Sequence, residues 1–315
     1  MRIVVALGGN ALLRRGESPD SAIQLEHVAE AAPALAEIAN EHELVLVHGN
    51  GPQVGMLALE SAADPVLTHP YPFSDLVAET QGVIGYWLQQ GLRNAGLATP
   101  VVTLVTQTLV DAADPAFGNP TKFVGTVYDR QRAHELARAN GWDVRRDGAG
   151  WRRVVASPQP LGIVELDTAR ALLAIGTTVV LAGGGGVPVV AGHHGLAGVE
   201  AVVDKDFVAA IVATALEADL LVMLTDVDGV YADYGTAQQR LMRRVTPDLL
   251  RSRSFPDGSM GPKVSAACRF VENTGMHAAI GSLASTGDVV DGTAGTQIRM
   301  SHTGARPRGA RHAHA

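Results

Sequence analysis

The chain has 315 residues, of which 46% are hydrophobic and only 18% are charged. This composition is typical of a folded protein with a sizeable core and excludes an intrinsically disordered chain. The net charge of −7 argues against general nucleic-acid binding, so an anionic ligand would need cations placed locally. No stretch approaches ~20 uninterrupted apolar residues, and the N-terminus lacks the pattern of a signal peptide. We therefore predict a cytoplasmic protein with neither a membrane nor a nucleic-acid partner.

Two short apolar runs in the first sixty residues, 3–7 and 44–47, predict buried parallel strands. A helix is predicted after each, one over about 18–42 with Ser18 as N-cap and one from Pro52 onward. Such units are typical of an α/β fold whose site lies at the carboxyl ends of its strands. The loops between these strands and helices consist of small residues that let a ligand approach the backbone: Gly8, Gly9, Asn10, Gly49, Asn50 and Gly51.

The alternation of helices and strands continues to the end of the chain and predicts one doubly wound sheet over residues 1–302. Pro33 is expected to kink or divide the first helix. Further helices are predicted over about 75–95, 167–175, 205–217, 247–251 and 263–273. Further strands are predicted over 101–105, 177–182, 220–224, 278–283 and 297–300.

Two segments depart from this pattern. Residues 117–165 are polar, with an arginine-rich helical pattern at about 130–140 and only short apolar alternation at Val154 and Val155. We interpret this segment as a hairpin with one helix that protrudes from the main sheet as a lid. The tail at 303–315 is rich in arginine and histidine and is predicted to be disordered.

The most informative stretch runs from residue 183 to residue 207. It opens with four consecutive glycines and closes at Lys205, where a long helical pattern begins. A helix N-terminus beside a lysine suits a phosphate group. Lysine is also rare in this chain, with three lysines against twenty-two arginines, which suggests that a compact ammonium is needed at glycine- or proline-rich junctions. These lysines are Lys122, Lys205 and Lys263.

The familiar nucleotide and metal signatures do not occur. The chain has no P-loop motif, no protein-kinase catalytic motif and no cysteine–histidine cluster, and Val54 replaces the third glycine of a dinucleotide-binding pattern. Three glycine-rich loops at strand ends, together with three lysines, favour phosphoryl transfer, which depends on positioning and on cations. The loop after Asn50 has no arginine to select a side chain, which favours a very small acceptor.

Several long strings lie in order over residues 1–300, namely residues 4–11, 48–55, 80–87, 119–122, 183–187, 198–207, 258–260 and 262–263. Together these strings resemble the carbamate kinases. The resemblance implies an open αβα sandwich with a mostly parallel sheet and a small protruding subdomain, usually in a homodimer. It also implies reversible phosphoryl transfer between ATP and carbamate, with Mg²⁺ held mainly through the nucleotide phosphates rather than by protein ligands. The usual role is ATP formation during arginine or purine-derivative breakdown.

The same resemblance implies roles for individual residues. Lys122 would contact carbamoyl phosphate from the lid, Lys205 and Lys263 would neutralise nucleotide phosphates, and Asp206 would orient these lysines. The phosphoryl group and carbamate would be held by Gly8, Gly9, Asn10, Gly49, Asn50 and Gly51. The nucleotide would also contact Gly184, Gly185, Thr225, Asp226, Asp228, Tyr231 and Met260.

Two alternatives stay open at this point. One alternative is another small-acceptor kinase of the amino acid kinase superfamily. Residues 225–229 are closer to that general superfamily than to the carbamate kinases, a departure that concerns detail at the nucleotide end and not the reaction. A nucleotide-binding protein that has lost catalysis is the other. The presence of Asp206 and all three lysines argues against that second alternative.

Overall fold

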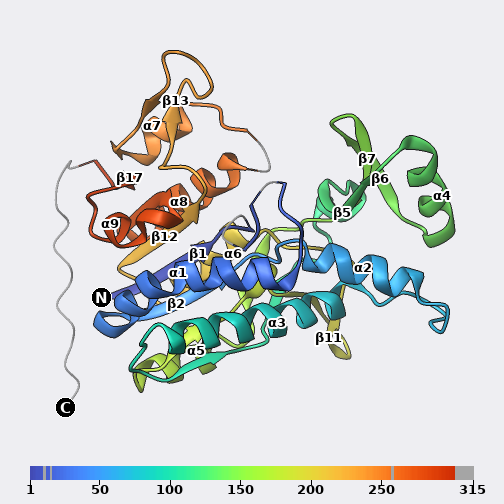
Figure 1. Ribbon diagram of the computed structural model, residues 1–315, viewed down its shortest axis with the longest axis horizontal. Helices are drawn as coiled ribbons and strands as arrows, with labels where there is room; N and C mark the ends of the chain where they lie inside the picture. Colours follow the sequence, from blue (N-terminus) through green and yellow to red (C-terminus); the bar gives the residue numbers. More distant parts are fainter. Residues whose placement is uncertain (10–11, 15, 257–258, 302–315) are drawn as a thin grey trace.

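The computed structural model describes residues 1–9, 12–14, 16–256 and 259–301 (Figure 1). The predicted role of Asn10 and the predicted disorder of the tail lie outside the described residues. Within these ranges the central sheet has eight strands, and neighbouring strands are parallel except for the pair β16 and β17. Their spatial order is β15 (Arg244–Val245), β17 (Thr296–Ile298), β16 (His277–Ser282), β12 (Leu220–Thr225), β1 (Arg2–Leu7), β2 (Glu43–His48), β9 (Thr178–Val180) and β3 (Val101–Thr103).

Helices cover both faces of this sheet, so the αβα sandwich and the mostly parallel sheet are confirmed. Side chains alternate along β1, and Ile3 and Val5 pack in one core cluster while Val4 and Ala6 pack in the other. The first face is covered by α1 (Ser21–Glu41), α3 (Phe73–Asn94) and α9 (Thr286–Val290). The second is covered by α5 (Leu166–Ala174), α6 (Lys205–Ala215), α7 (Pro247–Arg251) and α8 (Met260–Thr274).

The prediction of a single sheet was incomplete. A four-stranded sheet lies beside the central one and a two-stranded ribbon precedes α7. These strands are short, and several carry glycine or proline rather than a long apolar run, so the sequence pattern did not separate them from loops. Their order is β11 (Gly195–Gly198), β10 (Val187–Gly192), β4 (Gln107–Val110) and β8 (Pro160–Ile163), and the ribbon pairs β13 (Tyr231–Ala232) with β14 (Arg240–Leu241).

A third small sheet stands apart from the central sheet, in green at the right of Figure 1. We call this sheet and its helix the lid, residues 122–155. It is one strand larger than the predicted hairpin with one helix. Asp129 caps the helix, and Gly141 ends it in the left-handed conformation at φ 68°. The lid consists of β5 (Lys122–Tyr128), α4 (Arg130–Asn140), β6 (Asp143–Asp147) and β7 (Gly150–Val155).

Two details of the first helix differ from prediction. Helix α1 begins at Ser21 and its N-cap is Asp20, in an extended conformation, so the predicted N-cap Ser18 is wrong. Pro33 does not divide the helix, which continues for 21 residues. Its buried face, including Leu35 and Ala36, packs on the sheet and offsets the missing hydrogen bond. None of the described helices has the length and hydropathy needed to span a membrane.

Candidate active site

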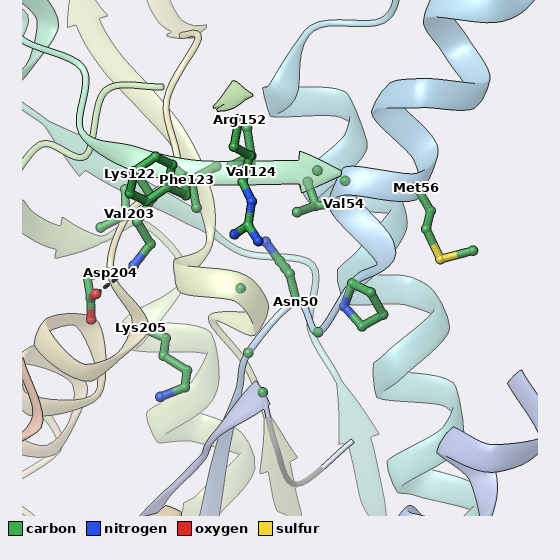
Figure 2. A pocket seen from close by; sticks show the side chains of 18 of the residues that line it. Asn50, Val54, Met56, Lys122, Phe123, Val124, Arg152, Val203, Asp204 and Lys205 are labelled. Carbon is green, nitrogen blue, oxygen red and sulfur yellow. Dashed lines mark hydrogen bonds and ion pairs between the residues drawn. The ribbon is translucent and has the colours of Figure 1, made fainter. Parts of the chain in front are cut away.

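A cavity of about 550 Å³ opens at the carboxyl end of the central sheet, and the lid forms one of its walls (Figure 2). Gly9 follows β1, and Gly49, Asn50 and Gly51 follow β2, so the ends of two neighbouring strands supply one wall. The other walls come from the lid, from Gly184, from the start of α6 and from the start of α8. The cavity thus lies where the parallel-strand rule places a ligand.

Two of the three lysines meet at one carboxylate in this cavity. Lys205 Nζ donates to Asp206 Oδ1 at 2.5 Å, and Lys263 Nζ donates to Asp206 Oδ2 at 3.0 Å. The side chains of both lysines are 12% exposed and that of Asp206 is 5% exposed. Each lysine therefore keeps a charged partner inside the protein while its ammonium lines the cavity.

The ion pairs decide the protonation of this cluster. Burial alone would raise the pKa of Asp206, but the two lysines outweigh it and lower that pKa to about 2. Burial opposes the charge of Lys205 as well, yet the Asp206 carboxylate raises its pKa overall. Burial and the neighbouring Lys205 lower the pKa of Lys263. The shared carboxylate thus outweighs burial at Lys205 but not at Lys263.

The third lysine reaches the same cavity from the lid. Lys122 Nζ donates to Asp204 Oδ2 at 2.8 Å, as the dashed line in Figure 2 shows. Asp204 is also the N-cap of α6, because its Oδ1 accepts a hydrogen bond from the backbone N–H of Asp206 at 3.0 Å. One carboxylate therefore joins the lid to the helix that carries Lys205.

Close backbone packing explains two of the glycines. A Cβ atom on Gly184 would lie 1.6 Å from Asn50 Oδ1, and φ at Gly184 is 65°. Asn50 is itself held by Thr80, whose hydroxyl donates to Asn50 Oδ1 at 2.9 Å. A Cβ atom on Gly49 would lie 3.4 Å from the side chain of Lys205. The glycine loops after β2 and β9 therefore contact each other through groups that a larger residue would separate.

A buried histidine lies behind these loops. The Nδ1 atom of His48 lies 2.8 Å from the carbonyl oxygen of Gly49. A carbonyl oxygen only accepts, so Nδ1 carries the proton and donates. Burial lowers the pKa of His48 to about 4, so its imidazole is neutral at physiological pH. Sequence reasoning did not single out this residue.

The structure brings some predicted nucleotide-side residues to the cavity and leaves others outside its lining. Lys205 and Lys263 lie in the lining, together with Gly184. Gly8 binds the carbonyl oxygen of Leu224 through its backbone N–H, next to the lining residue Gly9. The predicted residues outside the lining are Gly8, Gly185, Thr225, Asp226, Asp228, Tyr231 and Met260.

The comparisons with known proteins agree with this geometry. The sequence profile of the amino acid kinase family matches residues 1–282. The chain is 48% identical to the carbamate kinase of Rhizobium meliloti, over 96% of this chain and 94% of that protein. It is also 48% identical to the carbamate kinase of Escherichia coli K12, over 95% and 99% of the two chains. The chain belongs to the carbamate kinases, within the amino acid kinase family.

A solved structure supports the same family at the level of the fold. The carbamate kinase of Giardia lamblia bound to AMP-PNP superposes with a TM-score of 0.88 at 38% identity, covering 95% of this chain and 98% of that one. As a member of the carbamate kinases, the chain is a phosphotransferase. The resemblance inferred from the sequence strings is thereby confirmed.

Sequence reasoning gave no role to two charged residues of the lining, Asp204 and Arg152. Arg152, on β7 of the lid, points into the cavity toward Asn50 (Figure 2). A very small acceptor was predicted because the loop after Asn50 contains no arginine. In the folded protein, however, Arg152 reaches that loop from about one hundred residues later in the chain. The run of residues 150–153 was recognised as polar, but nothing in its pattern indicates which way its arginines point.

Proposed function

We propose that the protein transfers a phosphoryl group reversibly between ATP and carbamate, giving ADP and carbamoyl phosphate. The observation that carries this proposal is the meeting of Lys205 and Lys263 at Asp206, in a cavity shared with the glycine loop after β2. The cavity offers paired cations on one side and a small, backbone-lined site on the other. This arrangement suits a phosphate donor and a small acceptor.

The reaction asks little covalent chemistry of the protein. An oxygen of carbamate attacks the γ-phosphorus of ATP, the bond from that phosphorus to its bridging oxygen breaks, and the electron pair leaves with ADP. Carbamate is already an anion, so no proton has to be removed. The protein must align the two substrates and balance the charge that moves between them.

Each part of the cavity takes a role in this proposal. Lys205 and Lys263 neutralise the phosphate oxygens, and Asp206 keeps the two ammonium groups side by side. Lys122 contacts carbamoyl phosphate from the lid. The backbone around Gly9 and the loop of residues 49–51 hold the acceptor and the transferred phosphoryl group. The nucleoside is received by the segment from the end of β12 to the start of β13 and by the start of α8, with Gly184 and Gly185 near the phosphates. The residues of these segments are Thr225, Asp226, Asp228, Tyr231 and Met260.

Mg²⁺ accompanies the nucleotide in this proposal. The carboxylates in the described lining, Asp204 and Asp206, are each paired with lysine. In kinase sites Mg²⁺ usually keeps several waters and is bound by substrate phosphates together with one or two carboxylates. The lining therefore fits a metal ion that arrives on the nucleotide and adds its charge to that of the lysines. The homodimer, the cytoplasmic location and a net flux toward ATP are further proposals that rest on the family resemblance.

The decisive experiment measures ATP formation from carbamoyl phosphate, ADP and Mg²⁺. We expect sustained ATP formation by the wild-type protein and a loss of about two powers of ten or more in kcat for Lys205→Ala. The exposed residue Arg146 lies outside the lining, so Arg146→Ala serves as a variant that also removes one positive charge. A wild-type protein that forms no ATP beyond the spontaneous breakdown of carbamoyl phosphate contradicts the proposal.

A negative result would also separate the two alternatives. Phosphoryl transfer from ATP to another small acceptor, an amino acid or a nucleoside monophosphate, would indicate a different kinase of the superfamily. An increase in thermal stability with ADP, without transfer to any acceptor, would indicate a nucleotide-binding protein that has lost catalysis.

A further inference from the structure

The charges of the cavity are not evenly matched. The lining contains the cations Lys122, Lys205, Lys263 and Arg152, with two carboxylates among the described residues. All three lysines are paired with those two carboxylates, which belong to Asp204 and Asp206. The carboxylate nearest Arg152, that of Asp147, lies outside the lining, with its Oδ2 3.1 Å from Arg152 Nε.

The Arg152 guanidinium contacts Asp147 and Phe123 of the lid, while its terminal nitrogens have no hydrogen bond to a described residue. The approach of Asp147 does not meet the angle of a hydrogen bond, so Nε is buried without one. The ring of Phe123 lies 5.8 Å from the Arg152 guanidinium carbon and flanks it. Within the part of the chain that the structure describes, no hydrogen bond occupies the two terminal nitrogens. The donors of Arg152 that point into the cavity are therefore available to a ligand.

The backbone of the lid determines the direction of the Arg152 side chain. Strand β5 loses register with β7 between Val124 and Tyr128, opposite Arg152, and Gly125 in that interval has φ 71°. Such irregularities redirect side chains near functional sites. The next residue, Arg153, points to the other side of β7, where its guanidinium carbon lies 4.6 Å from the ring centre of Phe73. That contact fixes the strand so that Arg152 faces the cavity.

We propose that Arg152 binds the acceptor, a small planar carboxylate-type anion, and determines the affinity for carbamate and carbamoyl phosphate. This inference rests on the proposed function. Figure 2 shows the Arg152 guanidinium beside Asn50 of the acceptor loop and away from Lys205 on the nucleotide side. A guanidinium presents two parallel N–H donors that match the two oxygens of a carboxylate or phosphate, which an ammonium does not.

Kinetics with each substrate varied in turn test the inference. For Arg152→Met we expect KM for carbamoyl phosphate to rise by about ten-fold or more, because a charge-assisted hydrogen bond is lost. KM for ADP should stay within about two-fold of the wild-type value. Arg152→Lys should recover only part of the affinity, and added guanidinium ion should restore activity to Arg152→Ala. Arg146→Met, on the neighbouring strand β6 and outside the lining, is the control with the same charge change.

The outcomes are distinct from those of the proposed function. An inactive wild-type protein contradicts the proposed function itself. An active wild-type protein with an unchanged KM for carbamoyl phosphate in Arg152→Met overturns only the role of Arg152. An equal rise in KM for both substrates in Arg152→Met and Arg152→Lys, without rescue by guanidinium, also overturns it, since it indicates a displaced lid.

Discussion

The nucleotide side of the cavity and the lid differ in the burial of their cations and in the partners that these cations have. On the nucleotide side, Lys205 and Lys263 start two helices of the main sandwich and share a buried carboxylate. On the lid, Lys122 and Arg152 are 36% and 31% exposed and lie on a three-stranded sheet. In the first group both ammonium groups are already hydrogen-bonded to the Asp206 carboxylate before any substrate binds, although two cations share that single negative charge. In the second group Lys122 has its own carboxylate, Asp204, whereas the Arg152 guanidinium keeps donors for a substrate. The two regions should therefore respond differently to substitution.

The largest effect is expected at Asp206. Asp206→Asn leaves two ammonium groups together without their shared charge, and breaking a buried ion pair costs about 3–5 kcal/mol. We expect kcat to fall by about a hundred-fold or more, together with a lower thermal midpoint. Steady-state kinetics of ATP formation and thermal unfolding measure the two effects.

Asp204 supplies the matched control for that prediction. Asp204→Asn keeps an N-cap side chain on α6 but loses the charge that pairs with the lid lysine Lys122. Its pair is partly exposed, so a smaller loss of kcat is expected. Equal losses in the two variants would show that the two cation groups are not energetically distinct.

A smaller effect is expected where the lid meets the main sandwich. The guanidinium carbon of Arg153 lies 4.6 Å from the ring centre of Phe73 and 4.4 Å from that of Trp142. A terminal nitrogen of the same group lies 3.4 Å from Glu200 Oε2. Burial lowers the pKa of Arg153 to about 10, which leaves it charged at neutral pH. Removing contacts worth roughly 0.5–2 kcal/mol each should loosen the lid in Arg153→Leu.

Hydrogen exchange of the lid strands tests this contact. We expect faster exchange of backbone amides in β5 and β7 in Arg153→Leu, with no change in β1 and β2 of the central sheet. Exchange rates in β5 and β7 that match the wild type would show that Arg153 does not hold the lid. Faster exchange in all four strands would show that the lid and the sandwich unfold together.

At neutral pH the smallest effect is expected at His48, at the end of β2 behind the acceptor loop, because its contribution to stability changes only in acid. Folding lowers the pKa of His48 from 6.5 to about 4, so between these values the unfolded chain binds a proton that the folded chain does not. The contribution of His48 to the free energy of unfolding is therefore full above pH 6.5. It falls as the pH drops toward 4, by roughly 3 kcal/mol at most. Thermal midpoints of the wild type and His48→Asn should converge over this range.

An exposed histidine provides the control for the pH experiment. His69 lies at the surface, and His69→Asn should leave the pH dependence of the thermal midpoint unchanged. If His48→Asn retains the full wild-type slope between pH 6.5 and 4, the slope comes from other groups and His48 does not contribute.

The sequence predicted the elements that have a single strong periodicity and missed those that depend on distant partners. The buried strands β1, β2 and β12 are continuous apolar runs, and Pro247–Arg251 matches α7 at both ends. The four-stranded sheet was missed because its short strands are defined only by their neighbours.

The candidate site shows the same division. The rarity of lysine pointed to Lys122, Lys205 and Lys263, and the structure places all three in one cavity. Arg152 is one of twenty-two arginines, so composition could not single it out. Its orientation depends on the loss of register in β5 and on Arg153, which are properties of the folded lid.

Helix α2 (Gln53–Ala63) follows the acceptor loop and packs against the lid, so a displacement of one should be transmitted to the other. A Cβ atom on Gly55 would lie 2.6 Å from the Cα atom of Gly125, so strand β5 rests directly on the backbone of α2. Gly51 and Pro52, at the start of the same helix, line the cavity. The start of α2 therefore forms part of the cavity wall near the acceptor and also supports strand β5 of the lid. A side chain at Gly55 would push strand β5 away from α2. This shift would move Arg152 away from the acceptor and leave Lys205 and Lys263, which lie on the main sandwich, in place.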